Sequence, residues 1–411
     1  MKCIIIAIGT EVVSGDIVNT DASYIANYIK KFGIETIRHV AVLDSKKAII
    51  KVVKQSLEKA ELVITTGGLG PTYDDITKIA IAKAVKLPLE KDEDSLDAIK
   101  AFFQKLGRDM TPNNERQSYF PKNSIIVPND NGTAPACITN CSKGTVIMLP
   151  GPPNEMIPLI QSKLVTEYFN SVKTEEICEV ILHFFGIGES SLEELLKDYM
   201  NKSKGLILAP YAKTGEVELK ITAKAKTAEE ACKKADDLKK KIYELAGEYI
   251  YGEGHVNLQK AMIRKLKEKG KKLITVESCT GGIIAGKITE IPGSSEVFLG
   301  GLVTYSNELK VMLADVKEAT LKEFGAVSKG TACEMAEGAR LKYNADVAVS
   351  VTGIAGPGGD TEDKPVGLVY IGISTADETT ATRFNFVGNR AKIRELSMKN
   401  ALYMVYDELN K

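Results

Sequence analysis

Short apolar segments recur along the first part of this chain. Most of them end at a glycine or proline, and a stretch of helical periodicity follows. They lie at residues 2–7, 35–42, 61–65 and 145–149. After the first segment, apolar residues recur at the spacing of one helix face, at Tyr24, Ile25, Tyr28, Ile29 and Phe32. Strands that alternate with helices form a mostly parallel sheet with crossover helices. The loops after the strands are therefore expected at one edge of the sheet, where ligands of such folds bind.

A chain of 411 residues exceeds one ordinary hydrophobic core, and its pattern divides it into three predicted domains. Residues 1–168 and 256–411 both alternate strands and helices. Residues 169–255 instead combine apolar strands with a helix rich in Ala, Lys and Glu, and the glycines of 251–255 indicate a linker. The predicted fold class is α/β, with two α/β domains of mostly parallel or mixed sheets joined by a small α+β module.

Composition and charge exclude several classes of protein. Lys and Arg together number 54, as do Asp and Glu, so no overall field attracts the chain to nucleic acid or to membranes. The seven cysteines form no CxxC pair and are odd in number, which argues against a disulfide framework and for a reducing compartment. No stretch approaches 18 apolar residues, and the first apolar segment is too short for a signal peptide. A soluble, cytoplasmic protein is predicted.

The small number of histidines limits the kinds of metal site and catalytic site that this chain can form. Only His39, His183 and His255 occur, far apart in the sequence, which argues against a zinc site built from His and Cys. None lies beyond residue 255, so a Ser-His-Asp triad within the C-terminal domain is excluded. A serine nucleophile in that domain therefore needs a lysine, a tyrosine or a carboxylate as its base.

The sequence ESCTGG lies between a predicted strand and a predicted helix. This places Ser278 and Cys279 on a tight turn, and makes the N–H groups of Thr280, Gly281 and Gly282 first-turn donors without an intrahelical partner. Such a terminus can hold a phosphate or a developing oxyanion, and a nucleophile beside it suits acyl transfer. Two other interpretations are that Ser278 only caps the helix, and that Cys279 is the nucleophile or a small buried residue.

The segment GLVTYSNELK supplies the candidate base. Tyr305 and Lys310 follow an apolar strand, and a lysine acts as a base when burial or a nearby cation lowers its pKa. A Ser–Lys–Tyr arrangement is chemically reasonable, although an isolated lysine is usually solvated. The glycine-rich loop VTGIAGPGG looks suited to a ligand. Arg390 and Arg394, four residues apart on one helix face, suit a phosphate, unless they only form an exposed face.

In the N-terminal domain, TTGGLGPTYDD follows a strand and precedes a helix. Gly67, Gly68 and Gly70 can form a backbone cradle for phosphate, although the motif is neither a Walker A loop nor a dinucleotide fingerprint. Asp74 and Asp75 add carboxylates that favour a hard divalent metal ion, unless one of them only caps the following helix. Further candidate substrate contacts on these loops are Gly9, Thr10, Glu11, Ser14, Thr72 and Gly151, and Asp16 and Glu155 are other loop acids. Asp21, just before the first helical run, is a plausible cap of that helix.

The motifs ESCTGG, PGSS, GGLVTYSNELK, GAVS, VTGIAGPGG and GNR occur in this order over nearly all of residues 257–411. In this respect the chain resembles the CinA family in its full-length form. The resemblance implies a nicotinamide mononucleotide deamidase, which gives nicotinate mononucleotide and ammonia without a cofactor. It assigns the nucleophile to Ser278 and catalytic roles to Tyr305 and Lys310. Residues that it places near the substrate are Thr352, Gly353, Gly356 and Arg394.

Residues 1–168 are similar to the MoaB/MogA-like molybdopterin-binding fold, in the version that CinA proteins carry. Molybdopterin-handling relatives commonly read Gly-Gly-Thr-Gly followed by Arg-Asp, whereas this chain has Leu69 and Asp74 at the threonine and arginine positions. An added negative charge in place of a cation disfavours molybdopterin chemistry. The resemblance implies instead an ADP-ribose pyrophosphatase that needs a divalent metal ion (Mg, Mn or Co) and gives AMP and ribose 5-phosphate. Asp74 and Asp75, from the chemistry of the loop, are its candidate catalytic residues and metal ligands.

The middle segment resembles the KH-like insert of CinA proteins. A KH loop that binds nucleic acid needs GxxG, whereas this chain has FGIGES at 185–190 and no interleaved basic and aromatic residues. We interpret the segment as a spacer or dimerisation element rather than an RNA-binding module. The resemblance also implies a homodimer.

Two hypotheses of different class follow. The first is a bifunctional pyridine-nucleotide salvage enzyme that acts on nicotinamide mononucleotide and ADP-ribose. The second is a competence- or damage-linked scaffold, or a regulatory nucleotide-binding protein, whose pockets have no turnover. Release of ammonia from nicotinamide mononucleotide separates the two.

Overall fold

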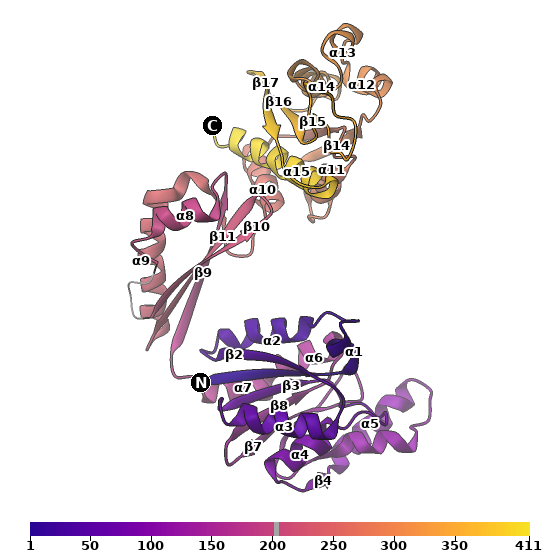
Figure 1. Ribbon diagram of the computed structural model, residues 1–411, viewed down its shortest axis with the longest axis vertical. Coiled ribbons are helices and arrows are strands. Elements are labelled where there is room, and N and C mark those ends of the chain that lie inside the picture. The colour runs from indigo at the N-terminus through magenta and orange to yellow at the C-terminus, as the bar shows by residue number, and fades with distance from the viewer. Residues whose placement is uncertain (201–204) are drawn as a thin grey trace. The chain divides into compact units, whose positions relative to one another are not determined.

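The computed structural model describes residues 1–200 and 205–411 (Figure 1). The chain forms two compact units, one made of Met1–Cys178 with Lys224–Lys233 and the other of Glu179–Ala223 with Lys234–Lys411. Within the described ranges, no helix has the length and apolar character needed to cross a membrane. Two mixed, helix-covered sheets and a smaller antiparallel sheet are present, which confirms the predicted α/β fold class.

The N-terminal unit is built on a six-stranded sheet in the order β2-β1-β3-β8-β7-β6. The first four strands are parallel, and the last two run antiparallel to their neighbours. Their bounds are β1 (Lys2–Ile8), β2 (Glu35–Val42), β3 (Leu62–Thr66), β8 (Gly144–Leu149), β7 (Ala136–Cys141) and β6 (Ile125–Val127). The four predicted strands are confirmed with ends shifted by one residue at most, whereas β6 and β7 escape prediction.

Helices cover both faces of this sheet because its buried strands present apolar side chains on both sides. One face, with Ile5 and Ile64, packs with α2 (Thr20–Lys30), α6 (Pro153–Ile160) and α7 (Lys163–Ser171). The opposite face, with Ile4 and Ile6, packs with α3 (Lys46–Leu57) and α4 (Thr77–Val85). Other elements of the unit are α1 (Thr10–Ser14), β4 (Leu89–Lys91), α5 (Glu93–Lys105) and β5 (Tyr119–Pro121).

The middle module is an antiparallel sheet in the order β10-β11-β9-β12 with two helices. Its elements are β9 (Glu176–Phe185), α8 (Glu189–Leu196), β10 (Leu206–Lys213), β11 (Glu216–Ala225), α9 (Ala228–Ala246) and β12 (Ile250–Glu253). The expectation of a linker at 251–255 is wrong for its first half. Tyr251 lies in β12 and is only 3% exposed, because its ring packs into a hydrophobic core.

The C-terminal sheet has the order β14-β13-β15-β16-β17. The first three strands are parallel, and β16 and β17 are antiparallel. The strands are β13 (Leu273–Glu277), β14 (Phe298–Val303), β15 (Val347–Gly353), β16 (Leu368–Ser374) and β17 (Thr379–Asn385). The sequence predicts strands at 272–276, 296–305, 345–351, 366–374 and 379–387, and all five observed strands lie within these segments or extend them by one or two residues at an end.

Helices α10 (Leu258–Lys269), α11 (Ile283–Thr289) and α15 (Arg390–Glu408) share one hydrophobic core with this sheet. Helices α12 (Asn307–Ala314), α13 (Glu318–Phe324) and α14 (Lys329–Lys342) follow β14, and α14 packs on the other side of the sheet. The sequence predicts caps at Asn257 and Asn389, before two runs of helical periodicity, and both are confirmed. Asn257 accepts from the N–H of Lys260, and Asn389 accepts from the N–H of Lys392, both at 2.9 Å.

Candidate active sites

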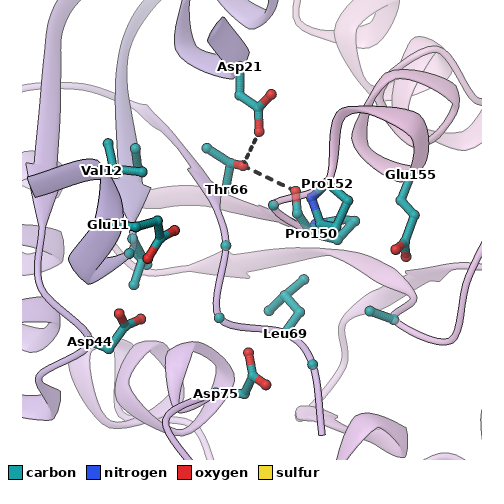
Figure 2. Close-up of a pocket in the computed structure, with 18 of the residues that line it drawn as sticks. Glu11, Val12, Asp21, Asp44, Thr66, Leu69, Asp75, Pro150, Pro152 and Glu155 are labelled. Carbon is teal, nitrogen blue, oxygen red and sulfur yellow. Dashed lines mark hydrogen bonds between the residues drawn. The ribbon is translucent and has the colours of Figure 1, made fainter. Parts of the chain in front are cut away.

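A cavity of about 550 Å³ lies at the carboxyl ends of β1, β3 and β8, where the strand order places the predicted loops. Six carboxylate side chains line it, and no Lys, Arg or His of the described chain does. Figure 2 shows most of them approaching the cavity from different elements. They are Glu11, Asp21, Asp44, Asp74, Asp75 and Glu155. So much negative charge around one space favours a cation, or a ligand that brings one, over a bare anion.

The glycines of the loop after β3 are needed for packing. Gly67 and Gly68 have φ of 99° and 67°, a region that other residues rarely adopt. A Cβ on Gly67 would lie 2.1 Å from the carbonyl oxygen of Ile8, and one on Gly68 would lie 2.2 Å from Oγ1 of Thr77. The N–H of Gly67 donates to the carbonyl of Leu149 at 3.0 Å. This N–H group is therefore not free to hold a phosphate.

Asp74 and Asp75 are both organised by Thr72. The N–H and hydroxyl of Thr72 donate to Oδ2 of Asp75 at 2.8 and 2.5 Å, and the hydroxyl also contacts Asp74. Hydrogen bonds from the hydroxyl of Thr72 and from the backbone N–H of Asp74 itself lower the pKa of Asp74, which is exposed and ionised. Helix α4 begins at Thr77 with no side-chain cap, so the interpretation of either aspartate as its cap is wrong.

Asp21 does not cap α2, as its position suggests in the sequence; Asn19 does, accepting from the N–H of Ala22 at 3.0 Å. The carboxylate of Asp21 instead accepts from the hydroxyl of Thr66 at 2.9 Å. Burial raises the pKa of Asp21, and the hydroxyl only partly offsets this. Burial likewise raises the pKa of Glu155, whose Oε2 accepts from Asn129 at 2.6 Å. These two carboxylates are poised to gain stabilisation from an incoming cation.

The residues fit a metal ion only in part. Among residues 1–200 and 205–411, no group of three or more His, Cys, Asp or Glu side chains is arranged to hold a metal. Magnesium in enzymes is commonly held by one or two carboxylates together with substrate phosphates and water. Asp74 and Asp75 can supply such carboxylate oxygens, with a substrate diphosphate supplying others.

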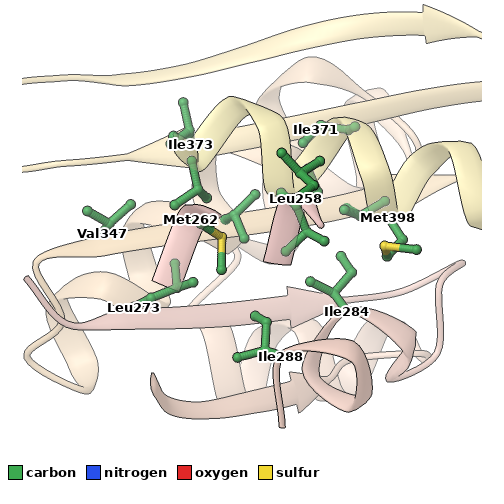
Figure 3. Packing of buried hydrophobic residues seen from close by; sticks show 14 of the residues in the cluster. Leu258, Met262, Leu273, Ile284, Ile288, Val347, Ile371, Ile373 and Met398 are labelled. Carbon is green, nitrogen blue, oxygen red and sulfur yellow. The ribbon is translucent and has the colours of Figure 1, made fainter. Parts of the chain in front are cut away.

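The second candidate site is at the carboxyl end of β13, where the turn that leads into α11 meets α12. Figure 3 shows Ile284 and Ile288 of α11, Met398 of α15 and Leu273 of β13 in one buried cluster. Since these side chains are buried, both helices are fixed against the sheet. The turn between β13 and α11 carries Ser278.

Glu277 shapes this turn. Its carboxylate is fully buried and accepts from the N–H groups of Gly282, Ile284 and Ala285 at 2.9, 3.1 and 2.8 Å. The N–H of Gly281 donates to the carbonyl of Ser278 at 3.1 Å. The prediction that the N–H groups of Gly281 and Gly282 are free donors is therefore wrong, because protein acceptors already occupy them.

Lys310 is the centre of the site. Its side chain is 1% exposed, and Nζ is 3.2 Å from Oγ of Ser278, 2.9 Å from the carbonyl of Thr304 and 3.3 Å from the carbonyl of Tyr305. Burial lowers the pKa of Lys310. Carbonyl oxygens can only accept, so a neutral amine gives its two N–H groups to them and turns its lone pair toward the hydroxyl of Ser278. The geometry thus suits a general base.

The two neighbouring candidates differ from this pair. Cys279 is 6% exposed and lies in the hydrophobic core, and burial raises the pKa of its thiol to about 11. It is therefore protonated and a poor nucleophile at neutral pH. Tyr305 contributes its carbonyl to Lys310, while its side chain is 63% exposed. Its phenol faces solvent and is accessible to a bound ligand.

Two arginines at the start of α15 join the loops around Ser278. Arg394 donates to the carbonyl of Thr280 at 2.6 Å, and Arg390 donates to the carbonyl of Gly356 at 2.8 Å. Nε of Arg394 is buried without a hydrogen-bond partner, and neither arginine forms an ion pair with a carboxylate within the described ranges. Two cations without anionic partners favour an anionic ligand here.

Comparison with known proteins matches all three parts of the chain. The CinA C-terminal domain matches residues 255–409, a probable molybdopterin binding domain matches 4–167, and the damage-inducible protein CinA KH domain matches 180–252. A competence-damage inducible protein from Clostridium botulinum strain 657 is 42% identical over 402 residues, or 98% of each chain. The chain belongs to the CinA family. A relative from Caldanaerobacter subterraneus is 44% identical over 405 residues, also 98% of each chain.

Solved structures of CinA proteins each match a part of the chain. A competence/damage inducible protein from Agrobacterium tumefaciens is 42% identical, and the match covers 38% of this chain and 94% of that one, with a TM-score of 0.37. CinA from Thermoplasma acidophilum is 34% identical, with 41% and 97% covered and a TM-score of 0.38.

Within this CinA chain, the structure brings many of the predicted residues together. Those that line the N-terminal cavity are Gly9, Glu11, Gly67, Gly68, Gly70, Asp74, Asp75 and Gly151. Thr10, Ser14 and Thr72 lie beside it and hydrogen-bond to Asp44, Asp16 and Asp75. Thr352 and Gly353 end β15, where Thr352 is buried and donates to the carbonyl of Ala326.

Sequence reasoning misses two carboxylates. Asp44 follows the end of β2, and its position after a strand is a signal that could have identified it. Glu277 precedes Ser278, but only the fold shows that its side chain turns back onto the helix terminus.

Proposed function

We propose that the chain is a bifunctional pyridine-nucleotide recycling enzyme whose C-terminal domain deamidates nicotinamide mononucleotide. The observation that carries the proposal is the 3.2 Å hydrogen bond between the buried amine of Lys310 and the hydroxyl of Ser278. Serine and lysine side chains at this distance form a nucleophile–base pair that needs no histidine. The identity of the substrate is inferred from the motifs that the chain shares with the CinA family.

The reaction proceeds in two steps. Neutral Lys310 takes the proton of Ser278 while Oγ attacks the carboxamide carbon, and the resulting ammonium returns a proton to the departing nitrogen, which leaves as ammonia. The second step uses Lys310 to deprotonate a water molecule, which attacks the ester carbon and releases nicotinate mononucleotide and free Ser278. The same lysine acts as base and acid in both steps. We also propose that the exposed phenol of Tyr305 contacts the substrate.

We propose that the two arginines at the start of α15 bind the 5′-phosphate of the substrate. Arg390 and Arg394 each use one donor on a loop carbonyl and retain others for a phosphate oxygen. Because Arg394 holds the carbonyl of Thr280, phosphate binding and the position of the nucleophile turn are physically linked.

Purified protein is expected to release one ammonia for each nicotinate mononucleotide formed from nicotinamide mononucleotide. Enzyme-coupled detection of ammonia, with product identification by chromatography, measures this. Absence of release, with intact binding of the nucleotide, would favour the scaffold or regulatory alternative.

For the N-terminal domain we propose hydrolysis of ADP-ribose to AMP and ribose 5-phosphate with a divalent metal ion such as Mg, Mn or Co. The six carboxylates around one cavity support it, since they would attract the metal that a diphosphate brings. The metal would polarise a phosphoryl oxygen. Asp74 and Asp75 would hold it, and Asp21 and Glu155 would add negative charge around it.

Asp74→Asn and Asp75→Asn should each lower metal-dependent ADP-ribose hydrolysis by a factor of about 10 to 100, because each removes a charged metal ligand. AMP formation measured over a titration of each metal is the readout, and the metal concentration at half-maximal rate should rise. Asp97→Asn, which changes an exposed carboxylate on α5, is the matched control. Full rates in both test variants would remove the two aspartates from the mechanism.

A further inference from the structure

Helix α15 makes contacts of two kinds. Its first two turns carry Arg390 and Arg394, which contact the loops around Ser278. Its later turns contact the middle module. The helix is continuous over 19 residues and contains no proline, so a displacement at one part is transmitted along its axis.

The turn between β10 and β11 is the first contact. Nζ of Lys399 donates to the carbonyl of Thr214 at 2.8 Å and is 3.0 Å from Oε1 of Glu216. The Lys399 and Glu216 side chains are only 16% and 11% exposed, so this ion pair is weakly screened. Gly215 lies between the two partners with φ of 72°, and a Cβ there would be 3.1 Å from Leu396. The turn therefore packs closely against α15.

Aromatic rings make the second contact. Phe185, at the end of β9, stacks on Tyr403 of α15 with centroids 4.2 Å apart and planes at 17°. Tyr251 of β12 donates to Oε2 of Glu216 at 2.6 Å and meets Tyr406 edge-on. Phe185 and Tyr251 belong to the same buried cluster as Met398. The module and the C-terminal domain therefore share a core, which is more than a spacer requires.

We propose that the middle module is a brace for α15 that sets the position of the phosphate-binding arginines, with Lys399 and Glu216 as positioning residues. This inference rests on the proposed deamidase function. Apolar packing alone tolerates small shifts of a helix, whereas the ion pair and its carbonyl contact fix the helix at one register. The Arg394–Thr280 bond of 2.6 Å depends on that register, because Arg394 is about 7.5 Å from Lys399 along the axis.

Lys399→Met tests the brace, because methionine keeps the aliphatic stem and removes every polar contact of the amine. KM for nicotinamide mononucleotide should rise about fivefold while kcat changes by less than about twofold. Glu216→Gln, which keeps the hydrogen-bond shape, should shift KM in the same direction by less. Lys411→Met, which removes an exposed amine paired with Glu408 beyond the braced turns, is the matched control and should leave both constants unchanged.

A double-mutant cycle shows whether Lys399 acts through the arginine. Arg394→Ala alone should raise KM, and adding Lys399→Met to it should raise KM no further, because the group being positioned is gone. Additive effects, or an unchanged KM in the single Lys399 and Glu216 variants, would overturn the brace while the deamidase assignment stands. A loss of kcat that follows loss of folded protein, measured by thermal unfolding, also counts against it. If the unsubstituted protein releases no ammonia, the proposed function fails and this inference with it.

Discussion

Ser278→Ala should lower ammonia release from nicotinamide mononucleotide by a factor of about a thousand or more, because Ser278 is the only side chain hydrogen-bonded to Nζ of Lys310 among the described residues. The substitution leaves the fold intact, since the main-chain N–H of Ser278 still donates to the carbonyl of Val351 at 2.9 Å. Single-turnover rates, and trapping of an acyl-enzyme by mass spectrometry in the unsubstituted protein, measure the effect. An unchanged melting temperature excludes unfolding as its cause.

Cys279→Ala is the matched control for this prediction. Its thiol is buried in the hydrophobic core and protonated, so its replacement should change the rate by less than about threefold. A small loss of stability is expected from the cavity that remains. The opposite pattern, with activity lost in the Cys279 variant and kept in the Ser278 variant, would transfer the nucleophile to the cysteine.

Most strands of the two large sheets could be predicted because their apolar runs are long and bounded. The four parallel strands of the N-terminal sheet and the caps at Asn257 and Asn389 are cases in which local sequence and tertiary structure agree. Strands β6 and β7 could not be predicted in the same way, because β6 has three residues and β7 carries polar residues at its end. β7 pairs with β8 and β6 pairs with β7, and this pairing decides that they are strands.

The sequence could predict where the candidate sites lie in the fold, but not the burial and hydrogen bonds that set their chemistry. Loops at the ends of parallel strands identify where Ser278 and the glycine-rich loop lie. The burial of Lys310 could not be predicted, since its helix has exposed neighbours such as Met312 and only the fold inserts the amine under Thr304. The same is true of Glu277, which occupies the helix terminus that sequence alone assigns to a ligand.

Lys310→Met should abolish deamidation to the same degree as Ser278→Ala, with a rate at least about a thousandfold lower. Methionine fills a similar volume but cannot accept the proton of Ser278. Lys310→Arg is the informative second variant, because a guanidinium stays protonated at any working pH and cannot act as the base. Both variants should bind nicotinamide mononucleotide with nearly unchanged affinity, measured by calorimetry, since Arg390 and Arg394 remain.

The pH dependence of the unsubstituted protein tests the state of this lysine. Burial lowers the pKa of Lys310 below its ordinary value near 10.5, so kcat/KM should rise with pH and level off above the lowered value, where the amine is neutral. The folded protein binds fewer protons than the unfolded chain between these two values, so the contribution of this group to stability also rises with pH across that window. Below this pH window, the buried ammonium lowers the stability of the fold.

Lys310→Met removes the cost of the buried ammonium, so this variant should melt at or above the melting temperature of the unsubstituted protein at neutral pH. A variant that loses both activity and thermal stability would mean that the ammonium holds the turn together, and Lys310 would then be a structural residue instead of the base.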